Sequence, residues 1–360
     1  MDQASTVAAI ADGTVRRRLV PQLVRHAPLL AFAAATVATS LAIKAAFVGS
    51  IQLDLVMLAI GLVLFWPMLL PALIPMLFFR VAVFEKPESP ARALFASVRP
   101  YLAADGRLLP GVLMLLAISV FMAGFASLKA SITFIQPFAW DQAFDEWDRI
   151  LHFGYRPWEL LQPILGYGPV TAFISINYNF WFLTLTMYWL HFAFAERPGV
   201  LRTQAVAAFM LTWSVGGVLL AIVFSSAGPC FYSLLGLAPD PYAGLMTYLR
   251  TTAESWPVWA LGLQDALWAN FASNGVADAT KGISAMPSMH NAQCLLLVLA
   301  VWNKAPIIRN LAIGHGVLVF LGSIHLGWHY AVDAYLAFVI AGIAWIAAGW
   351  FARRWEKATA

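Results

Sequence analysis

Charged residues are scarce in this chain. Asp, Glu, Lys and Arg make up only 11% of its 360 residues, whereas hydrophobic residues make up 61%. A soluble domain is typically about 25% charged, so a surface that faces water on all sides cannot be built from this sequence. The mean hydropathy of +0.75 points the same way. The composition excludes an ordinary soluble protein and predicts an integral membrane protein.

Signals for disulfides, metal ions and secretion are also missing. The two cysteines, Cys230 and Cys294, lie near or within separate apolar runs, so no disulfide framework is predicted. His325 and His329 are four residues apart, yet no H-E-x-x-H helix or thiolate set accompanies them. We therefore expect neither a metal ion nor another cofactor. Residues 1–28 are polar and mixed, without the compact apolar core and cleavage site of a signal peptide.

Long apolar runs, in contrast, are abundant. A helical span needs about 20 apolar residues, and seven runs reach that length. An eighth would reach it if its helix began near Pro287, because proline suits the first helical turn. The pattern predicts an all-α, polytopic transmembrane helix bundle of about eight spans: 29–49, 53–79, 108–128, 170–195, 203–227, 291–302, 306–327 and 330–351.

The distribution of positive charge predicts how these spans are oriented. Residues 1–28 contain three consecutive arginines and are interpreted as a basic cytoplasmic tail. With eight spans and the N-terminus inside, most of the 22 lysines and arginines fall in inner segments, as the positive-inside rule requires. We therefore expect both termini in the cytoplasm, N-terminal transmembrane helices over residues 29–128, and a catalytic membrane domain over residues 129–360.

Two long outer segments carry distinctive aromatic patterns. Residues 228–289 contain several tryptophans and prolines, typical of an aromatic belt at the headgroup level or of a lid over a lipid headgroup. Residues 138–162 predict either an interfacial amphipathic helix or a helix that caps the bundle. Large apolar residues recur there at helical spacing and aspartates lie elsewhere around the turn: Trp140, Phe144, Trp147 and Leu151, with Asp141, Asp145 and Asp148.

Two short stretches place histidine and aspartate at the edges of apolar runs: residues 287–290, which end at His290, and residues 329–333. An ionisable residue at membrane depth is costly to keep and is usually functional. If residues 329–333 are helical, Asp333 can accept a hydrogen bond from one ring nitrogen of His329 and leave the other nitrogen to attack. His290 supplies a second imidazole that can act as an acid. The alternative is that each histidine only makes hydrogen bonds inside the bundle.

These residues resemble the type 2 phosphatidic acid phosphatase superfamily, which has a P-S-x-H block followed by an H-x-x-x-D block. The resemblance covers roughly residues 138–350 and implies a bundle of transmembrane helices and a phosphohistidine mechanism. It implies that His329 is the nucleophile, Asp333 the residue that orients it, and His290 the general acid. The sequence is most similar to the branch that contains inositol phosphorylceramide synthases, in the segments Ser284–His290, Gly327–Tyr330 and Ser226–Pro229.

Two features of that superfamily are absent. No K-x6-R-P block occurs, and Gly322 and Ser323 stand where the family has a Ser-Arg pair, so the arginine that clamps the phosphate is missing. Phosphoryl transfer needs charge neutralisation on the phosphoryl oxygens, which other groups must then supply. The candidates are backbone N–H groups at the helix start near Pro287 and the side chains of Ser288, Lys281, His325, Tyr232 and Tyr330. The alternative for Lys281 is a solvated loop lysine, and the alternative for the two tyrosines is aromatic anchoring.

We expect an integral membrane lipid phosphatase or phosphotransferase that acts through a phosphohistidine, without a metal, on the extracytoplasmic side. Its partners would be a phospholipid or sphingolipid substrate and the lipid bilayer, with no nucleic acid. The resemblance favours transfer of a phosphoryl headgroup between lipids, whereas the motifs alone do not separate hydrolysis from transfer. The alternative is a membrane transporter or lipid-binding protein that uses His and Asp as a proton relay.

Overall fold

All regular structure in the described part of the chain is helical, which confirms the predicted all-α class. The computed structural model describes residues 3–48, 78, 81–82, 86–103, 108–273 and 282–359. Its helices are α1 (Gln3–Phe47), α4 (Pro90–Ala103), α5 (Leu108–Ile135), α6 (Asp141–Leu151), α7 (Pro157–Leu165), α8 (Gly168–Leu190), η2 (His191–Ala195), α9 (Val200–Ser214), η3 (Val215–Leu220), α10 (Ala221–Val223), η4 (Pro229–Phe231), η5 (Ser233–Leu235), α11 (Ala243–Ala253), α12 (Trp259–Ala272), α13 (Met289–Ala300), α14 (Pro306–His325) and α15 (Ala331–Ala358).

Five helices in the described ranges are long and apolar enough to cross a bilayer, so the chain is an integral membrane protein with a polytopic bundle. Each coincides with a predicted span. The helix α8 has 23 residues but is not among the five, because its asparagines, tyrosines and tryptophans lower its hydropathy. The predicted span 53–79 lies outside the described residues. The five helices are Val20–Phe47, Leu108–Ile135, Val200–Val223, Pro306–His325 and Ala331–Ala358.

The eighth predicted span corresponds to α13, which has only 12 residues. Its rise of about 18 Å is shorter than the hydrocarbon core of about 30 Å. The sequence predicts a helix start near Pro287, but the helix begins at Met289. Ser288 takes the N-cap position, where its side chain accepts a hydrogen bond from the Asn291 N–H. Residues 282–288 therefore enter the bundle in a non-helical conformation.

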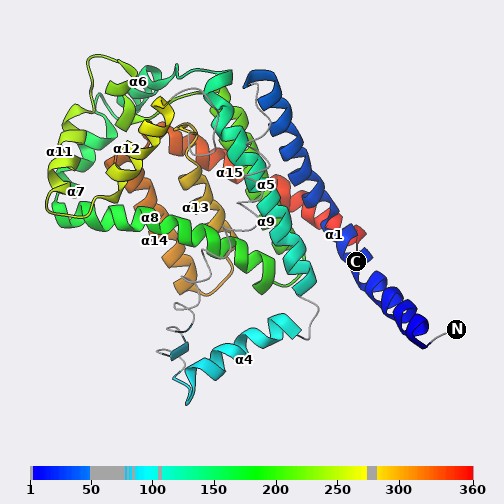
Figure 1. Cartoon of the computed structure of the whole chain (residues 1–360). Coiled ribbons are helices and arrows are strands. Elements are labelled where there is room, and N and C mark those ends of the chain that lie inside the picture. Colours follow the sequence, from blue (N-terminus) through cyan, green and yellow to red (C-terminus); the bar gives the residue numbers. More distant parts are fainter. Residues whose placement is uncertain are drawn as a thin grey trace.

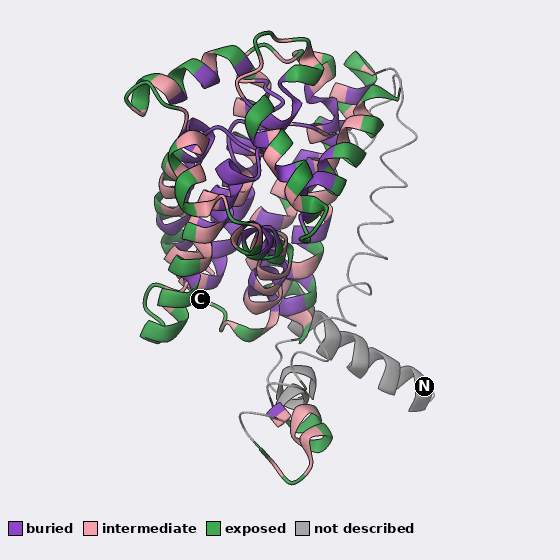
Figure 2. Cartoon of the chain, turned by 90° about the vertical axis from the view of Figure 1, so that its left-hand side faces the viewer, coloured by how far each residue is buried: buried purple, intermediate pink, exposed green. Residues whose placement is uncertain are grey.

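The helices pack as a bundle with two different ends. α1 lies along α5, α15 packs against α9 and α13, and α14 packs against α8 and α13. Figure 1 shows the short helices α6, α11 and α12 gathered at one end, which we call the α6 end. The C-terminus and the start of α1 lie toward the opposite end, which we call the terminal end. Figure 2 shows buried residues concentrated in the interior of the bundle.

The N-terminal segment is helical from its first described residue. α1 runs without a break from Gln3 to Phe47, so the segment predicted as a cytoplasmic tail continues directly into the first span. The apolar part of this helix begins at Val20, ahead of the predicted boundary at residue 29. The first span is therefore longer than the sequence pattern indicates.

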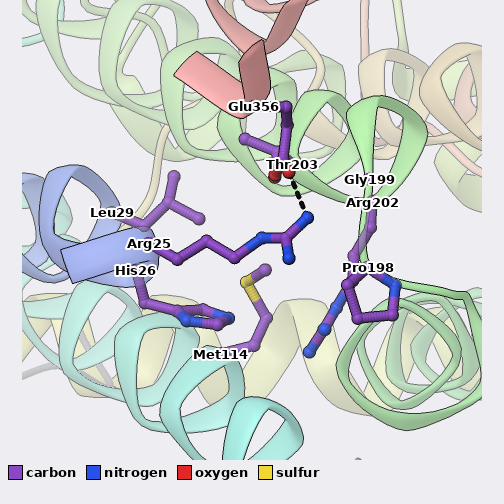
Figure 3. A pocket seen from close by; sticks show the side chains of 9 residues that line it. All are labelled: Arg25, His26, Leu29, Met114, Pro198, Gly199, Arg202, Thr203 and Glu356. Atoms are coloured by element: carbon purple, nitrogen blue, oxygen red, sulfur yellow. Dashed lines mark hydrogen bonds and ion pairs between the residues drawn. The ribbon is translucent and has the colours of Figure 1, made fainter. Parts of the chain in front are cut away.

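A buried polar cluster joins three helices at the terminal end (Figure 3). The Arg25 guanidinium of α1 forms an ion pair with Glu356 of α15, and the Thr203 hydroxyl of α9 donates to the other Glu356 oxygen. Every charged group in this cluster has a partner, and the cluster ties the first helix to the last. Arg202 completes it by donating, at 2.7 to 2.9 Å, to the carbonyl oxygens of Pro110, Phe192 and Ala193.

α6 is the predicted amphipathic helix, and it lies on the end of the bundle by its acidic face. Asp141, Asp145 and Asp148 are buried together with Phe144, whereas Trp147 and Leu151 are exposed. Apolar side chains that face outward suit the membrane interface, so the helix has features of both predicted alternatives. Buried carboxylates need hydrogen-bond donors. Asp145 finds them in the side chains of Arg156 and Tyr242, whereas Asp141 and Asp148 bond to residues close to the histidines.

Candidate active site

Three non-helical segments meet at the α6 end: residues 225–228, 282–288 and 326–330. Non-helical backbone at membrane depth is stable only where it is buried in protein and its polar groups are paired. These segments meet that condition by bonding to one another and to the start of the last helix. The N–H groups of Ala285, Cys230 and Ser288 donate, at 2.8 to 3.1 Å, to the carbonyl oxygens of Ser226, Gly327 and Asp333 respectively.

Gly228 allows two of these segments to approach closely. Its φ of +106° is a left-handed conformation that favours glycine. A Cβ atom at this position would lie 2.6 Å from the Trp328 carbonyl oxygen. Any other residue would push the segment that ends at Gly228 away from the segment that carries His329.

His329 and Asp333 form the predicted hydrogen bond, with Nδ1 and Oδ2 at 3.0 Å. The prediction of this bond is conditional on a helix over residues 329–333. In the structure α15 begins at Ala331, and Asp333 reaches back from its first turn. The same oxygen accepts the Tyr330 N–H at 3.1 Å. Both side chains are buried. A carboxylate acceptor at Nδ1 holds the imidazole proton there and leaves the lone pair on Nε2.

His290 lies beside His329, with 6.1 Å between the ring centroids. Two residues of α8 hold its ring: the centroid of Trp181 is 4.1 Å away and that of Tyr178 4.8 Å away. The Trp181 indole N–H also donates to the His290 carbonyl oxygen at 3.1 Å. The structure therefore brings His290, His329 and Asp333 together, with α13, α15 and α8 each fixing part of the group.

Asp141 of α6 ties two of the non-helical segments together, a role that was not identified from the sequence. Its carboxylate accepts the N–H groups of Ala227 and Gly228 at 2.8 to 3.1 Å. It also accepts the hydroxyl of Tyr330 at 2.9 Å. Burial raises the pKa of Asp141, while the backbone donors lower it. One side chain thus connects the segment before η4 to the residue that follows His329.

Asp148, two turns later on the same face of α6, holds the start of the last helix. Its two oxygens accept the N–H groups of Ala331 and Val332 at 2.8 and 3.0 Å. A carboxylate at a helix N-terminus satisfies free N–H groups and complements the helix dipole. Burial raises the pKa of Asp148 to about 7, and the two N–H donors oppose that shift. Asp148 therefore fixes the turn of α15 that presents Asp333.

The position where the resemblance places an arginine carries no charge. Ser323 is fully buried, and its hydroxyl donates to the Phe320 carbonyl oxygen at 2.7 Å. The Asn291 amide donates to the Ser323 oxygen at 3.2 Å and to the Ser288 oxygen at 3.0 Å. Ser288, predicted as a substrate donor, is thus engaged as the cap of α13. At this position the chain has neutral hydrogen-bonding side chains, where the resemblance implies a positively charged arginine.

The remaining residues predicted to bind substrate make their contacts elsewhere or lie outside the described residues. His325 bonds to the Thr171 hydroxyl of α8, with Nε2 and Oγ1 at 2.9 Å. Tyr232 packs against another tyrosine, with ring centroids 5.6 Å apart. The hydroxyl of Tyr330 is committed to α6. Lys281 lies outside the described residues.

Several buried polar atoms beside the histidines lack a hydrogen-bond partner in the described residues: Asp333 Oδ1, Trp328 Nε1 and the Tyr178 hydroxyl. The rings of Tyr178 and Trp328 are nearly parallel, with centroids 6.3 Å apart. An unsatisfied buried group costs about 1–3 kcal/mol, and native structures keep few of them. Unpartnered buried atoms also occur elsewhere among the described residues, but these three lie beside the two imidazoles, where a polar ligand would pair with them.

His329 is held in the form that a nucleophile needs. Burial lowers the pKa of His329 below the ordinary value of 6.5, and the positive charge of Lys129 on α5 lowers it further. The backbone of Ala285 opposes these effects. A lowered pKa keeps the imidazole neutral at neutral pH, so its lone pair is available for attack.

The family profile described as the PAP2 superfamily matches residues 142–348, more than half of the chain and both histidine segments. The chain belongs to the PAP2 superfamily. Members of this superfamily are phosphatases and phosphotransferases, so membership indicates an enzyme of that class, and together with the membrane helices it indicates a lipid substrate. No curated protein and no solved structure matches the chain. Helices α1 and α5 lie outside the matched residues.

Proposed function

We propose that the protein is a lipid phosphotransferase or phosphatase in which His329 forms a phosphohistidine intermediate. The observation that carries this proposal is the 3.0 Å hydrogen bond between His329 Nδ1 and Asp333 Oδ2, made beside a second imidazole at His290. An aspartate in this position fixes the tautomer and stabilises the positive charge that develops on the ring. The arrangement supplies a nucleophile, its orienting residue and a proton donor.

The reaction has two steps. In the first, His329 Nε2 attacks phosphorus, the bond from phosphorus to the leaving oxygen breaks, and His290 gives that oxygen a proton. In the second, an incoming hydroxyl gives its proton to His290 while its oxygen attacks the phosphohistidine, and the phosphorus–nitrogen bond breaks. Water as the incoming group completes a hydrolysis, and an alcohol completes a transfer. Asp333 remains bonded to Nδ1 throughout.

The resemblance to inositol phosphorylceramide synthases favours transfer of a phosphoryl headgroup between lipids. It is carried by residues 284–290 and 327–330, which in this structure form two of the segments that meet at the site. The incoming group would then be a lipid hydroxyl or a headgroup hydroxyl rather than water. A phospholipid or a sphingolipid is the donor or acceptor that this resemblance supports.

We place the active site on the extracytoplasmic side. The segments that carry His290 and His329 are bonded to the start of α15, which is bonded to α6. The ion pair of Arg25 and Glu356 joins α1 to α15 at the terminal end. The excess of Lys and Arg predicted for inner segments favours a cytoplasmic location for both termini. The substrate would therefore be a lipid of the outer leaflet.

The test is turnover by purified protein with a panel of radiolabelled phospholipids, each offered with inositol, ceramide or diacylglycerol as acceptor. We expect labelled product and an acid-labile, alkali-stable phosphoryl label on the wild-type chain, absent from His329→Ala. Activity should survive EDTA, because the mechanism uses imidazoles in place of metal ions. Full inactivation by EDTA that a divalent ion reverses would contradict the proposal, and a protein that only transports lipid would give no product.

A further inference from the structure

A large cavity lies between α8, α13 and α14, which pack on one another (Figure 1). Its volume is about 770 Å³, and most of the side chains that line it are apolar. The described residues that line it do not include His290, His329 or Asp333. A cavity of this size is typical of a site that encloses a small ligand. The phosphoryl chemistry proposed above gives this cavity no role.

Three hydrogen-bonding side chains meet within this apolar lining. The His315 ring of α14 bonds to two residues of α8, with Nδ1 3.1 Å from Asn177 Oδ1 and Nε2 3.2 Å from Thr184 Oγ1. All three residues line the cavity, and we call them the His315 group. An ionisable residue within a membrane-spanning helix faces a cavity or a partner and usually has a function. The His315 group therefore marks this cavity as a candidate binding site.

The His315 group has a hydrogen-bonding atom to spare. Nδ2 of Asn177 is buried and has no partner in the described residues. The Thr184 hydroxyl already donates to the Trp181 carbonyl oxygen at 2.9 Å. A buried amide group without a partner costs about 1–3 kcal/mol. A ligand hydroxyl in the cavity would remove this cost, because a hydroxyl both accepts and donates and so pairs with either atom of an amide.

The depth of the His315 group restricts what such a ligand can carry. His315 lies halfway along α14, a helix of 20 residues that is apolar enough to span the bilayer. At a rise of about 1.5 Å per residue, it is about 14 Å from the start of that helix, and the hydrocarbon core is about 30 Å thick. A charged headgroup at this depth is costly, whereas a hydroxyl or carbonyl with hydrogen-bond partners is tolerated. The polar end of the ligand should therefore be uncharged.

The ionisable residues at one end of the cavity point to the same kind of ligand. Lys304, just before α14, donates to Glu196 Oε2 at 2.9 Å, and the Nε2 atom of His191, just after α8, lies 3.2 Å from the same oxygen. A carboxylate thus already occupies the cation, and an anionic headgroup would have to displace it. The lining favours a neutral lipid over a phospholipid.

α8 connects this cavity to the surroundings of His290. Tyr178, which directly follows Asn177, has its ring centroid 4.8 Å from that of His290. Trp181 accepts the bond from Thr184 and donates its indole N–H to the His290 carbonyl oxygen at 3.1 Å. One helix therefore carries both the polar residues of the cavity and the residues that hold His290. This arrangement suits a ligand that the phosphoryl chemistry produces or consumes.

We propose that this cavity binds a neutral, hydroxyl-bearing diacyl lipid, the phosphate-free lipid that phosphoryl chemistry at His329 releases or consumes. The inference rests on the proposed function. The oxygen of the lipid hydroxyl bonds to the amide of Asn177, and an acyl chain occupies the apolar lining. Loss of the phosphate is what allows the polar end of such a lipid to reach this depth. A phospholipid, which keeps its charge, is selected against.

The experiment measures photolabelling of the His329→Ala protein, which should not consume the probe, in phosphatidylcholine nanodiscs. The probe is a radiolabelled diacylglycerol with a diazirine on one acyl chain, and the competitors are dioctanoylglycerol and dioctanoyl phosphatidate. We expect saturable labelling of α8 and α14 that dioctanoylglycerol suppresses and phosphatidate does not. Gly314 lines the cavity, and a Cβ there would meet nothing within 4 Å. Gly314→Leu fills this space and should lower the labelling by at least about tenfold.

Gly342→Leu is the matched control. A Cβ at Gly342 of α15 would also meet nothing within 4 Å, and the residue does not line the cavity. Both changes put the same side chain in place of a helical glycine, so their effects on helix propensity are alike. Gly342→Leu should be labelled as the parent is. Asn177→Leu removes the amide at similar size and should lower the labelling by about threefold to tenfold, the equivalent of one hydrogen bond.

Equal labelling of the parent and Gly314→Leu would overturn the inference. So would an equal loss in Gly342→Leu, or suppression by phosphatidate as strong as that by dioctanoylglycerol, which would reveal ordinary contact with bilayer lipids. Each variant is first compared with the parent by its melting temperature in detergent. Should Gly314→Leu fail to fold, Gly314→Val takes its place with the same expectations.

The outcomes also separate this inference from the proposed function. If the wild-type protein turns over no lipid but labelling still depends on Gly314 and Asn177, the phosphohistidine proposal fails and the neutral-lipid site stands. If lipids are turned over while labelling is unchanged in Gly314→Leu, only the neutral-lipid site fails.

Discussion

Both ends of the bundle bury charged groups, but the two ends differ in how many of those groups have a bonded partner. At the terminal end, Glu356 is bonded to Arg25 and to Thr203. At the α6 end, Asp333 is bonded through one oxygen and its other oxygen has no partner in the described residues. A fully paired network stabilises a fold, whereas open groups cost stability and are kept where a ligand uses them. Mutations at the two ends should therefore separate stability from activity.

The largest effect should come from His329→Ala. Loss of the nucleophile should reduce turnover by several orders of magnitude, because single members of a catalytic triad contribute that much. The melting temperature should change little, since the bond to Asp333 is one of many contacts at this end. His290→Ala and Asp333→Asn should be nearly as damaging, through loss of the acid and of the correct tautomer. Steady-state rates of folded protein test this, and retention of more than about a tenth of the wild-type rate would rule out the assignment.

Substitution of the α6 aspartates should have the second-largest effect on turnover, because these residues position the site without touching substrate. Asp148→Asn keeps one acceptor oxygen but turns an amide donor toward an N–H of Ala331 or Val332. The start of α15 should shift, and displacement of a catalytic group by about 1 Å can cost about a hundredfold in rate. We expect a 10- to 100-fold fall in kcat, on the order implied by that displacement.

The matched control for this change is Asp265→Asn. Asp265 is an exposed carboxylate on α12 whose side chain is 59% accessible and pairs with Arg250 at 3.0 Å. Its loss should leave kcat unchanged, because exposed ion pairs contribute little. If Asp148→Asn were as active as this control, α6 would be a cap with no role in positioning.

The terminal end should respond in stability rather than in rate. Glu356→Gln leaves the Arg25 charge without its ion-pair partner, and we expect a loss of about 1–3 kcal/mol in the free energy of unfolding. The kcat of the folded fraction should stay within about twofold, because the cluster lies at the other end of the bundle. Unfolding in a graded mixture of detergents gives the first quantity. A fall in kcat that matched that of Asp148→Asn would mean that the two ends are coupled.

The pH dependence tests the environment of His329 specifically. Asp333 of α15 is bonded to its ring, His290 of α13 lies beside it, and the charge of Lys129 on α5 lowers its pKa. Because the pKa of His329 lies below 6.5, the neutral, reactive form persists as pH falls to that value. The acid limb of kcat/KM should therefore lie below pH 6.5. Lys129→Met removes one cause of the lowering, so the limb should move to higher pH; movement to lower pH would contradict this account.

The smallest perturbation tests orientation alone. Ser273 is exposed and directly follows α12, one of the helices gathered at the α6 end. Ser273→Cys, made with the buried Cys230 and Cys294 replaced, should react with a membrane-impermeant maleimide in intact cells and keep its activity. Labelling only after the membrane is broken would place the active site on the cytoplasmic side.

The grouping of His290, His329 and Asp333 could be predicted because ionisable residues at the edges of apolar runs stand out in the sequence. Histidine and aspartate at the edges of apolar runs are expensive, and the spacing of His329 and Asp333 allows the bond that the structure contains. The helix of residues 141–151 was also predictable from its periodicity. The direction of its acidic face was not, because periodicity defines two faces without showing which one is buried.

Lys129 shows what sequence patterns cannot supply. In the sequence it is an isolated lysine at the end of an apolar run, consistent with an outer loop. Its effect on the pKa of His329 depends on the path of residues 282–288, which are non-helical and follow no period. The same is true of Ser288, whose hydroxyl is occupied by Asn291. Contacts among irregular segments are set by the packed structure, so local propensity does not reveal them.

The bonds made by α6 also have a consequence for the order in which the site is assembled during synthesis. Asp141 bonds to Tyr330 across 189 positions of the chain, and Asp148 bonds to Ala331 across 183. A ribosome that has released α6 must still deliver six more α-helices, α7 to α12, and then α13 and α14 before these partners exist. Contacts of such long sequence separation form late. The contacts that hold Tyr330 and the start of α15 against α6 therefore form only after the residues that begin α15 have been synthesised.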